Sequence, residues 1–260
     1  MEDGVALLSA LRRTYGLARS SLIYRANVPK LRRAHAFYRR FVAAGDLCFD
    51  IGAHLGDRTA TFRRLGARVI AVEPQPLLLT RLARRFGRDP GVALVAAALG
   101  AALGHGELAI DPMNPTIATL SHDFIRKAGA SRGFRSARWR ERATVEVMTL
   151  DALIAAHGLP AFCKIDVEGY EDAVLEGLSR PLPALSLEYL PAALEPALAA
   201  IARLERLGAY RFNRSPGESM RLHHSRWLNT VEIAAELRQI PCEDGAGDIY
   251  ALLDAPAFSR

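Results

Sequence analysis

One stretch near the start of the chain constrains the fold more than any other. Residues 46–57 read DLCFDIGAHLGD, in which a hydrophobic run ends at Asp50 and is followed by Gly52 and Gly56. Residues 58–65 then have helical spacing. Glycine lets a backbone pass close to a ligand because it has no Cβ atom, and a helix N-terminus offers unpaired N–H groups. The stretch therefore predicts a strand, a turn and a helix at the ligand-binding edge of a parallel sheet.

The ligand is indicated by the glycine spacing and by a second strand. The dinucleotide fingerprint is G-x-G-x-x-G, whose second glycine admits a pyrophosphate, but this chain has His54 at that position. Residues 68–72 form a second predicted strand that ends in Glu73. An acid at that place can accept hydrogen bonds from ribose hydroxyls. The pattern suits an adenosine ligand without a pyrophosphate, and S-adenosylmethionine is the candidate that we favour.

Length and composition are those of a soluble globular protein. The 260 residues, of which 50% are hydrophobic, can bury one large α/β core or two small ones. The longest weakly polar run, residues 92–104, is too short to span a bilayer, and the first ten residues lack the features of a signal peptide. Three widely spaced cysteines suit reduced thiols rather than disulfides or a metal site. We therefore expect a cytoplasmic protein.

Basic residues are concentrated in two stretches, although the net charge is only +6. Residues 1–44 contain nine Lys and Arg residues and two acids, and a second basic stretch runs from 126 to 142. We interpret both as solvated faces. The alternatives are attraction to an acidic substrate or contact of the N-terminal helices with anionic lipid headgroups, and we do not expect the latter. Nucleic-acid binding is not expected, because the basic residues are not interleaved with aromatic ones in a recognised module.

Strands and helices alternate along most of the chain. This alternation favours a doubly wound, mostly parallel sheet, and the last two strands fit an antiparallel edge. The predicted strands are residues 47–50, 68–72, 92–98, 104–110, 144–148, 184–189, 210–213 and 247–253, together with one that starts at Phe162 and ends at Asp166 and Glu168. The predicted helices are residues 5–42 with a break at 28–29, 58–65, 74–86, 150–157, a segment that ends at 178, 195–207 and 225–239.

Residues 111–142 are predicted to be a loop with turns at Asp111-Pro112 and Asn114-Pro115. The end of this segment is basic and contains Phe134 and Trp139. An excursion of this length inside a compact domain is usually functional or disordered. We interpret it as a lid or an acceptor-binding insert.

Six pieces of the chain resemble the FkbM-type S-adenosylmethionine-dependent methyltransferases. The most specific is KIDVEG at residues 164–169, which follows TLD. The family commonly has Asn where this chain has His54, and we expect cofactor binding to survive because both side chains donate hydrogen bonds. The pieces are FDIGAHLGDRTATF (49–62), VIAVEPQP (69–76), TLDALI (149–154), KIDVEGYEDAVLEGL (164–178), SLEY (186–189) and GDIYA (247–251).

The resemblance implies a class I methyltransferase (Rossmann-like) fold. This is a seven-stranded, mostly parallel sheet with one antiparallel strand and helices on both faces. Residues 1–44 would form an N-terminal helical extension and residues 45–260 the methyltransferase domain. The implied activity is transfer of a methyl group from S-adenosylmethionine to a hydroxyl on a sugar, glycan or natural product. The alternatives are a nicotinamide-dependent Rossmann oxidoreductase and a non-catalytic cofactor-binding scaffold.

The candidate site residues lie at the ends of the predicted strands. Catalytic roles are predicted for Asp166, as the proton acceptor, and for Glu168, with an exchange of roles left open. The alternatives are that Glu168 caps the next helix and that Asp166 bonds to backbone amides. Asp50 either binds the cofactor amino group or holds the turn, and His54 either contacts the methionine carboxylate or faces solvent. The predicted cofactor-binding residues are Asp50, Gly52, His54, Gly56, Glu73, Pro74 and Asp166.

No metal site is predicted. Asp166 and Glu168 have the oxygen ligands that Mg²⁺ prefers, but the sequence places no further acid beside them. Lys164 is expected to be structural or to form an ion pair. His223 and His224 are adjacent, so we expect them to point apart and at most one to face the site.

Overall fold

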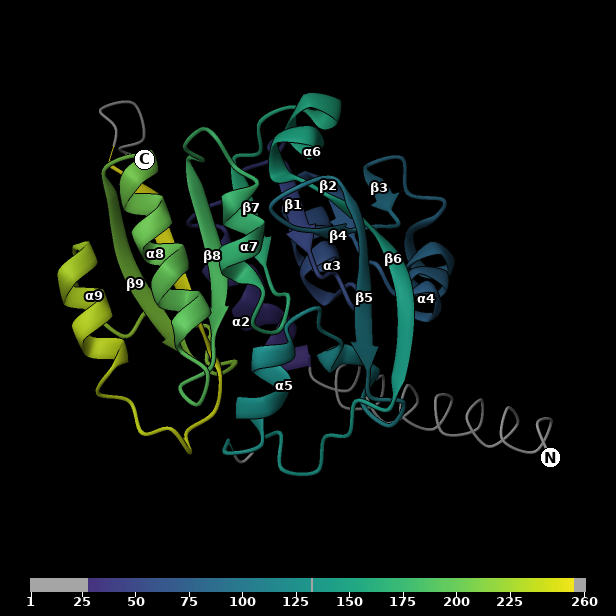
Figure 1. Ribbon diagram of the computed structural model, residues 1–260. Helices are drawn as coiled ribbons and strands as arrows, with labels where there is room; N and C mark the ends of the chain where they lie inside the picture. The colour runs from purple at the N-terminus through teal and green to yellow at the C-terminus, as the bar shows by residue number, and fades with distance from the viewer. Residues whose placement is uncertain (1–27, 132, 255–260) are drawn as a thin grey trace.

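The computed structural model describes residues 28–131 and 133–254, and its centre is a seven-stranded sheet (Figure 1). The strands are β1 (Leu47–Ile51), β2 (Arg68–Val72), β3 (Val92–Val95), β7 (Phe162–Ile165), β8 (Ala184–Tyr189), β9 (Tyr210–Pro216) and β10 (Gly247–Leu253). They lie in the order β3-β2-β1-β7-β8-β10-β9. Neighbours are parallel from β3 to β8, and β10 is antiparallel to both β8 and β9. This is the class I methyltransferase fold that the resemblance implies.

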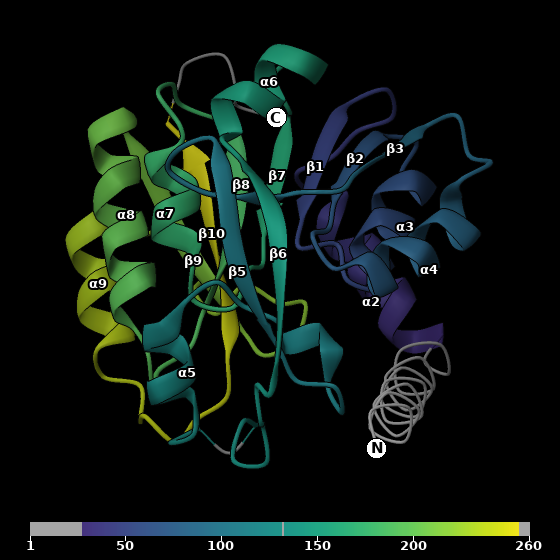
Figure 2. The same ribbon diagram turned by 45° about the vertical axis from the view of Figure 1, so that its right-hand side comes forward.

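Helices cover both faces of this sheet, as the two layers in Figure 2 show. One face carries α2 (Val28–Tyr38), α3 (Asp57–Arg64) and α4 (Pro76–Phe86). The other carries α6 (Leu150–His157), α7 (Glu171–Glu176), α8 (Glu195–Leu207) and α9 (Thr230–Leu237). The predicted helix over residues 5–27 lies outside the described residues.

The central strand β1 shows how the sequence produces the two layers. Successive side chains of a strand point to opposite faces, and all five residues of β1 are buried. Phe49 and Ile51 belong to the core under α6–α8, whereas Cys48 belongs to the core under α2 and α3. Strands buried on both faces are continuous hydrophobic runs, which is why LCF could be recognised as a central strand.

A smaller sheet lies beside the central one and corrects one prediction. The predicted strand over residues 92–98 is divided between the two sheets. After β3 the chain leaves the large sheet, and β4 (Ala98–Leu99) pairs in parallel with β6 (Glu141–Met148). The same β6 pairs antiparallel with β5 (Gly104–Ile110). Hydrophobic continuity cannot reveal where a run changes partners, because both segments bury apolar side chains.

The prediction of a loop over residues 111–142 is also wrong in part. The segment contains a 3₁₀ turn, η1 (Pro115–Ile117), and the helix α5 (His122–Ala128), and β6 begins at Glu141. Helix α5 starts at an N-cap, where the Ser121 hydroxyl accepts a hydrogen bond from the Phe124 amide. The rings of Phe124, Phe134 and Trp139 pack together, and the Trp139 indole donates to the Ile117 carbonyl. These rings belong to a small hydrophobic core that the segment shares with Leu190 and Ala193.

The C-terminal part of the chain differs from prediction at one helix. Only α9 is helical within residues 225–239, because Asn229 and Glu232 form a capping box that starts the helix there.

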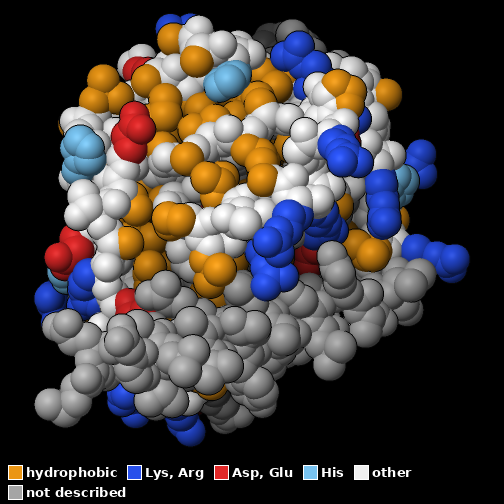
Figure 3. Space-filling view, turned by 90° about the vertical axis from the view of Figure 1, so that its right-hand side faces the viewer, with side chains coloured by type: hydrophobic (Ala, Val, Ile, Leu, Met, Phe, Trp, Pro, Cys, Tyr) orange, Lys and Arg blue, Asp and Glu red, His pale blue; other side chains and the backbone are white. Residues whose placement is uncertain are grey.

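Figure 3 shows the face of the molecule that carries α4, and Lys and Arg side chains gather on one side of this face. Within residues 28–131 and 133–254, no helix has the length and hydrophobicity needed to cross a membrane.

Candidate functional site

The glycine turn after β1 is shaped by contacts within the protein. The amides of Gly52 and Ala53 both donate to the Val72 carbonyl at 3.0 Å. Gly52 has φ 71°, and a Cβ atom there would lie 1.8 Å from the Asp166 carbonyl oxygen. Gly56 has φ 79°, and its Cβ would collide with the ring of Phe86. Both glycines are therefore required by the approach of neighbouring elements, whereas the sequence suggested only the approach of a ligand.

Glu73 lies directly beside this turn, at the end of β2. Its side chain is buried, and its two carboxylate oxygens accept hydrogen bonds from the amides of His54 and Gln75, each at 2.9 Å. Burial raises the pKa of Glu73 and these two backbone hydrogen bonds oppose the rise. Glu73 thus holds the turn in place, and it also faces a hollow that adjoins the turn.

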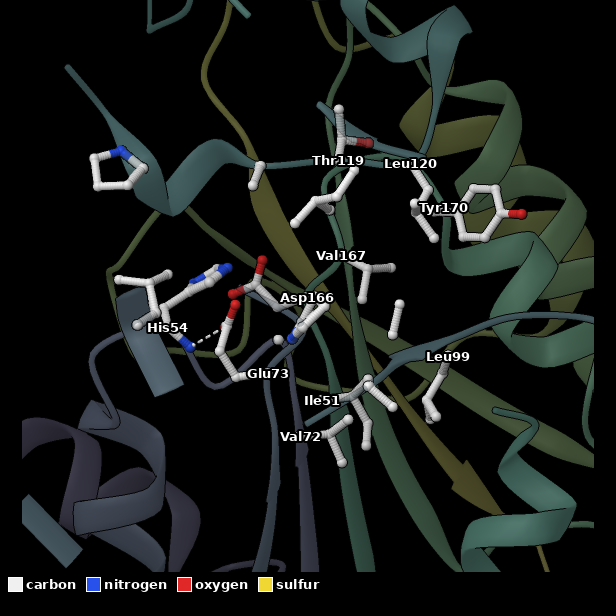
Figure 4. Close-up of a pocket in the computed structure, with 18 residues that line it drawn as sticks. Ile51, His54, Val72, Glu73, Leu99, Thr119, Leu120, Asp166, Val167 and Tyr170 are labelled. Atoms are coloured by element: carbon white, nitrogen blue, oxygen red, sulfur yellow. Dashed lines mark hydrogen bonds between the residues drawn. The ribbon is translucent and has the colours of Figure 1, made fainter. Parts of the chain in front are cut away.

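This hollow, which we call the main hollow because it adjoins the glycine turn, opens between the central sheet and the small sheet (Figure 4) and has a volume of about 470 Å³ with its open mouth included. His54, Glu73 and Asp166 lie close together on one side of it, and Thr119, Leu120 and Tyr170 lie across from them. Most of the remaining lining is apolar. The lining residues are Ile51, Gly52, His54, Val72, Glu73, Pro74, Leu78, Ala97, Ala98, Leu99, Leu108, Pro115, Ala118, Thr119, Leu120, Asp166, Val167 and Tyr170. A small molecule with one polar and one apolar end fits such a lining.

A second, more polar hollow adjoins the first and shares Gly52, His54 and Asp166 with it. Asp50 lines this second hollow. The Asp50 carboxylate accepts a hydrogen bond from the Thr59 hydroxyl at 2.5 Å, and burial raises its pKa. Since the turn amides bond to β2, this carboxylate is not what holds the turn.

Asp166 follows β7 and is paired with Lys164, so the ion-pair alternative for this lysine is the one that the structure shows. The Lys164 ammonium donates to the Asp166 carboxylate at 2.5 Å, and the lysine side chain is only 4% exposed. Burial alone would raise the pKa of Asp166, but the Lys164 ammonium lowers it below the ordinary value. Asp166 is therefore ionised at neutral pH and a weak proton acceptor.

Glu168, two residues further on, has a different environment. It is 6% exposed, and its backbone is left-handed with φ 55°. Its Oε2 atom is buried and has no hydrogen-bond partner within residues 28–131 and 133–254. Burial and the nearby carboxylates of Asp166 and Glu171 raise the pKa of Glu168 well above its usual range. In its ionised form, Glu168 is the stronger base of the two candidates.

Two further acids surround Glu168, and the sequence analysis assigned neither to the site. Glu171 accepts hydrogen bonds from the amides of Val167 and Gly169 and so holds the turn before α7. The sequence analysis gave such a capping role as an alternative for Glu168. Burial raises the pKa of Glu171 to about 7. Glu188, on the neighbouring strand β8, has its pKa raised by burial and by Glu168. Adjacent parallel strands end at the same edge, a signal that could have placed Glu188 here.

The expectation that His223 and His224 point apart is wrong. Their rings lie 4.7 Å apart, and both face Glu236, which also accepts a hydrogen bond from Arg214. These residues line a third hollow, separate from the two that His54 and Asp166 share. This position argues against a role for His223 or His224 as a catalytic base beside Asp166.

The sheet order, the turn at Gly52 and the acid at Glu73 define a class I methyltransferase domain. Residues 50–208 match the methyltransferase FkbM domain, and the chain belongs to this family.

Individual relatives are distant. A hexuronic acid methyltransferase, AglP, of Haloferax volcanii is 25% identical over 143 residues, which are 54% of this chain and 53% of that protein. The match thus spans about half of the relative's length. The crystal structure of a methyltransferase FkbM from Methylobacillus flagellatus has a TM-score of 0.47 at 16% identity, over 80% of this chain and 43% of that one. The crystal structure of an S-adenosylmethionine-dependent O-methyltransferase from Thermotoga maritima has a TM-score of 0.41 at 12% identity, over 86% of this chain and 65% of that one.

Proposed function

We propose that this protein is an S-adenosylmethionine-dependent methyltransferase that methylates an oxygen atom of a sugar-type acceptor. Membership of the FkbM family supports methyl transfer. The single observation that carries the proposal is the position of Glu73. Its buried carboxylate lies beside the Gly52 turn and faces the same hollow as Asp166, where a ribose-binding acid belongs in such a sheet.

The lining of the main hollow suits the three parts of this cofactor. Glu73 would accept hydrogen bonds from the ribose hydroxyls. The apolar side, with Ala97, Leu99 and Leu120, would enclose the adenine. The polar side, near His54 and Asp166, would take the methionine part, whose amino and carboxylate groups need polar surroundings.

Methyl transfer requires the acceptor oxygen, the methyl carbon and the sulfur to lie in line, and much of the rate can come from this positioning. The bond from sulfur to methyl breaks as the bond from oxygen to methyl forms, and the hydroxyl loses its proton. We assign this proton to Glu168, whose Oε2 has no other partner in the described residues. Asp166 is assigned to positioning, because Lys164 already occupies one of its oxygens.

The acceptor is proposed to be an acidic sugar. The FkbM relative of H. volcanii is named for a hexuronic acid. In this chain, Arg135, Arg138, Arg140 and Arg142 are exposed in the segment that we interpret as the acceptor-binding insert. Opposite charge raises the local concentration of such a substrate.

The two alternatives are less well supported. A nicotinamide oxidoreductase does not agree with the FkbM family match or with His54 in the glycine turn. A non-catalytic scaffold would have no need of the Glu168 carboxylate, which has a buried oxygen without a partner in the described residues and lies two residues from Asp166 in the lining, because such a group destabilises the fold.

Calorimetric titration of the full chain with S-adenosylmethionine, and in parallel with NADH, tests the proposal. We expect binding of the first and none of the second. The acceptor class is then tested by incubating the protein with an isotopically labelled methyl donor and a cell extract, followed by mass spectrometry. Absence of S-adenosylmethionine binding by a folded protein would overturn the proposal, and label on a neutral product would overturn the acidic acceptor.

A further inference from the structure

Three side chains with metal-ligating atoms lie close together, and two of them, His54 and Asp166, line both hollows. His54 comes from the turn after β1, and Asp166 and Glu168 come from the segment after β7. One ligand atom from each lies within 4.8 Å of the other two. The strands pair in parallel, Ile51 with Ile165, so the turns that follow them meet at one edge. Figure 4 shows His54 and Asp166 on the same side of the main hollow.

Glu168 is the residue whose surroundings point to a missing ligand. Its Oε2 atom is buried without a partner in the part of the chain that the structure describes. The Lys164 ammonium is bonded to Asp166. A buried carboxylate oxygen that has lost its water and gained no donor destabilises the protein. A cation bound between these side chains would remove that cost.

The backbone supports the same reading. Only three non-glycine residues with positive φ occur within residues 28–131 and 133–254, and two of them are His54 and Glu168. Left-handed conformations of such residues are unfavourable and tend to occur at functional sites. Here they are held by the rest of the fold, since the His54 amide donates to Glu73 and the Thr119 hydroxyl donates to the Glu168 carbonyl.

We propose that His54, Asp166 and Glu168 together bind a divalent metal cation. One imidazole nitrogen with two carboxylates is a donor set that suits Mn²⁺, since carboxylates suit Mg²⁺ and Mn²⁺ whereas imidazole suits the transition metals. The remaining coordination positions would face the hollows that share His54 and Asp166.

The role of this cation rests on the proposed function, although its binding does not. A hydroxyl bound to the cation becomes more acidic. Glu168 has two oxygens, so ligation by one leaves the other to take the acceptor's proton as the methyl group passes from sulfur to oxygen.

A second cluster, His223, His224 and Glu236, has similar geometry and provides the matched control. There the Arg214 guanidinium already bonds to the Glu236 carboxylate. A bound cation would lie next to that fixed positive charge. We therefore expect no metal at this cluster.

The test is a titration of the full chain with Mn²⁺ alone, after removal of metal with a chelator, followed by electron paramagnetic resonance. We expect one bound Mn²⁺ per chain with spin-echo modulation from an imidazole nitrogen. Glu168→Gln should weaken binding at least about tenfold, because fewer charged ligands lower the affinity. Glu236→Gln should bind Mn²⁺ like the wild type. Metal-free Glu168→Gln should melt no lower than the metal-free wild type, because the carboxyl group that it replaces has a buried oxygen without a partner in the described residues.

His54→Asn provides a second variant, because Asn tolerates the left-handed backbone at this position. It should abolish the nitrogen modulation and weaken Mn²⁺ binding. Failure of the wild type to bind Mn²⁺, or binding that survives Glu168→Gln and His54→Asn, would overturn the inference. Calorimetry with S-adenosylmethionine on the same samples separates the two proposals. If S-adenosylmethionine binds and Mn²⁺ does not, the metal site is wrong and the proposed function stands. If Mn²⁺ binds and S-adenosylmethionine does not, the proposed function is wrong and the metal site stands.

Discussion

The Lys164 ammonium lies 2.5 Å from the Asp166 carboxylate, and this ion pair gives different roles to the two carboxylates that follow β7. One oxygen of Asp166 is occupied and its negative charge is stabilised, so this residue is suited to attract cations rather than protons. Glu168 lies two residues away without such a partner, and burial favours its neutral form. The same short segment thus presents one carboxylate that stays ionised and one carboxyl group that binds a proton more strongly.

We first predict that Lys164→Met destabilises the fold. The substitution leaves Asp166 without its partner, and removal of one member of a fully buried pair costs roughly 3–5 kcal/mol. Because the Asp166 side chain is 22% exposed, we expect a smaller loss of about 2–3 kcal/mol. Urea unfolding measures it. The double variant Lys164→Met/Asp166→Asn should recover much of the loss, and equal destabilisation of the single and double variants would show that the pair is not coupled.

The second prediction concerns proton transfer. Glu168→Gln should lower turnover by about 10²–10⁴-fold, the usual contribution of a positioned general base. Asp166→Asn should have a smaller effect on turnover and a larger effect on cofactor affinity, since Lys164 occupies its oxygen. Single-turnover kinetics with calorimetry on each variant separate the two effects. The opposite pattern would return the base to Asp166, as the sequence alone suggested.

The fold could be predicted from sequence more fully than the site. The boundaries of β2, β8, β10, α6 and α8 agree with those predicted, because caps, glycines and apolar runs mark them locally. The position of β4 could not be predicted, since it depends on pairing with β6, which is distant in sequence.

At the site, sequence could name His54, Glu73, Asp166 and Glu168 but could not predict their partners. The Gly52 contact with the Asp166 carbonyl and the convergence of His54 on Glu168 depend on the spacing of two strands. The orientation of His223 and His224 could not be predicted, because their segment is neither a helix nor a strand. Adjacent side chains point apart only on a regular element.

The third prediction is that Glu73→Ala weakens S-adenosylmethionine binding. Loss of a charged acceptor for the ribose hydroxyls should cost roughly 1.5–3 kcal/mol. Release of the His54 and Gln75 amides should add to this loss. Glu232→Ala is the control, because Glu232 also accepts a backbone hydrogen bond but lies at the cap of α9, away from the hollow. Wild-type affinity in a folded Glu73→Ala protein would show that Glu73 does not bind the ribose.

The fourth prediction separates two costs at the glycine turn. Gly45 and Gly52 both have positive φ, but a Cβ on Gly45 would meet no atom within 4 Å, whereas one on Gly52 would overlap the Asp166 carbonyl. Gly45→Ala should therefore cost only the left-handed backbone penalty, about 1–2 kcal/mol. Gly52→Ala should cost clearly more and should also weaken cofactor binding, because β1 and β7 must separate. Chemical unfolding of both variants measures the difference, and equal costs would contradict the close approach of the two strands.

The last prediction concerns the proposed acceptor-binding insert. Arg135 and Arg138 are exposed there, and an acidic acceptor would be attracted to them over a distance that salt shortens to roughly 10 Å at 0.1 M. The double substitution Arg135→Gln/Arg138→Gln should raise the acceptor's Michaelis constant by roughly tenfold, with cofactor affinity unchanged. Arg81→Gln/Arg84→Gln removes the same charge from the exposed face of α4 and is the matched control. The acceptor's apparent affinity should also fall as ionic strength rises. An acceptor affinity that changes neither with salt nor with the insert variant would identify these arginines as an ordinary solvated surface.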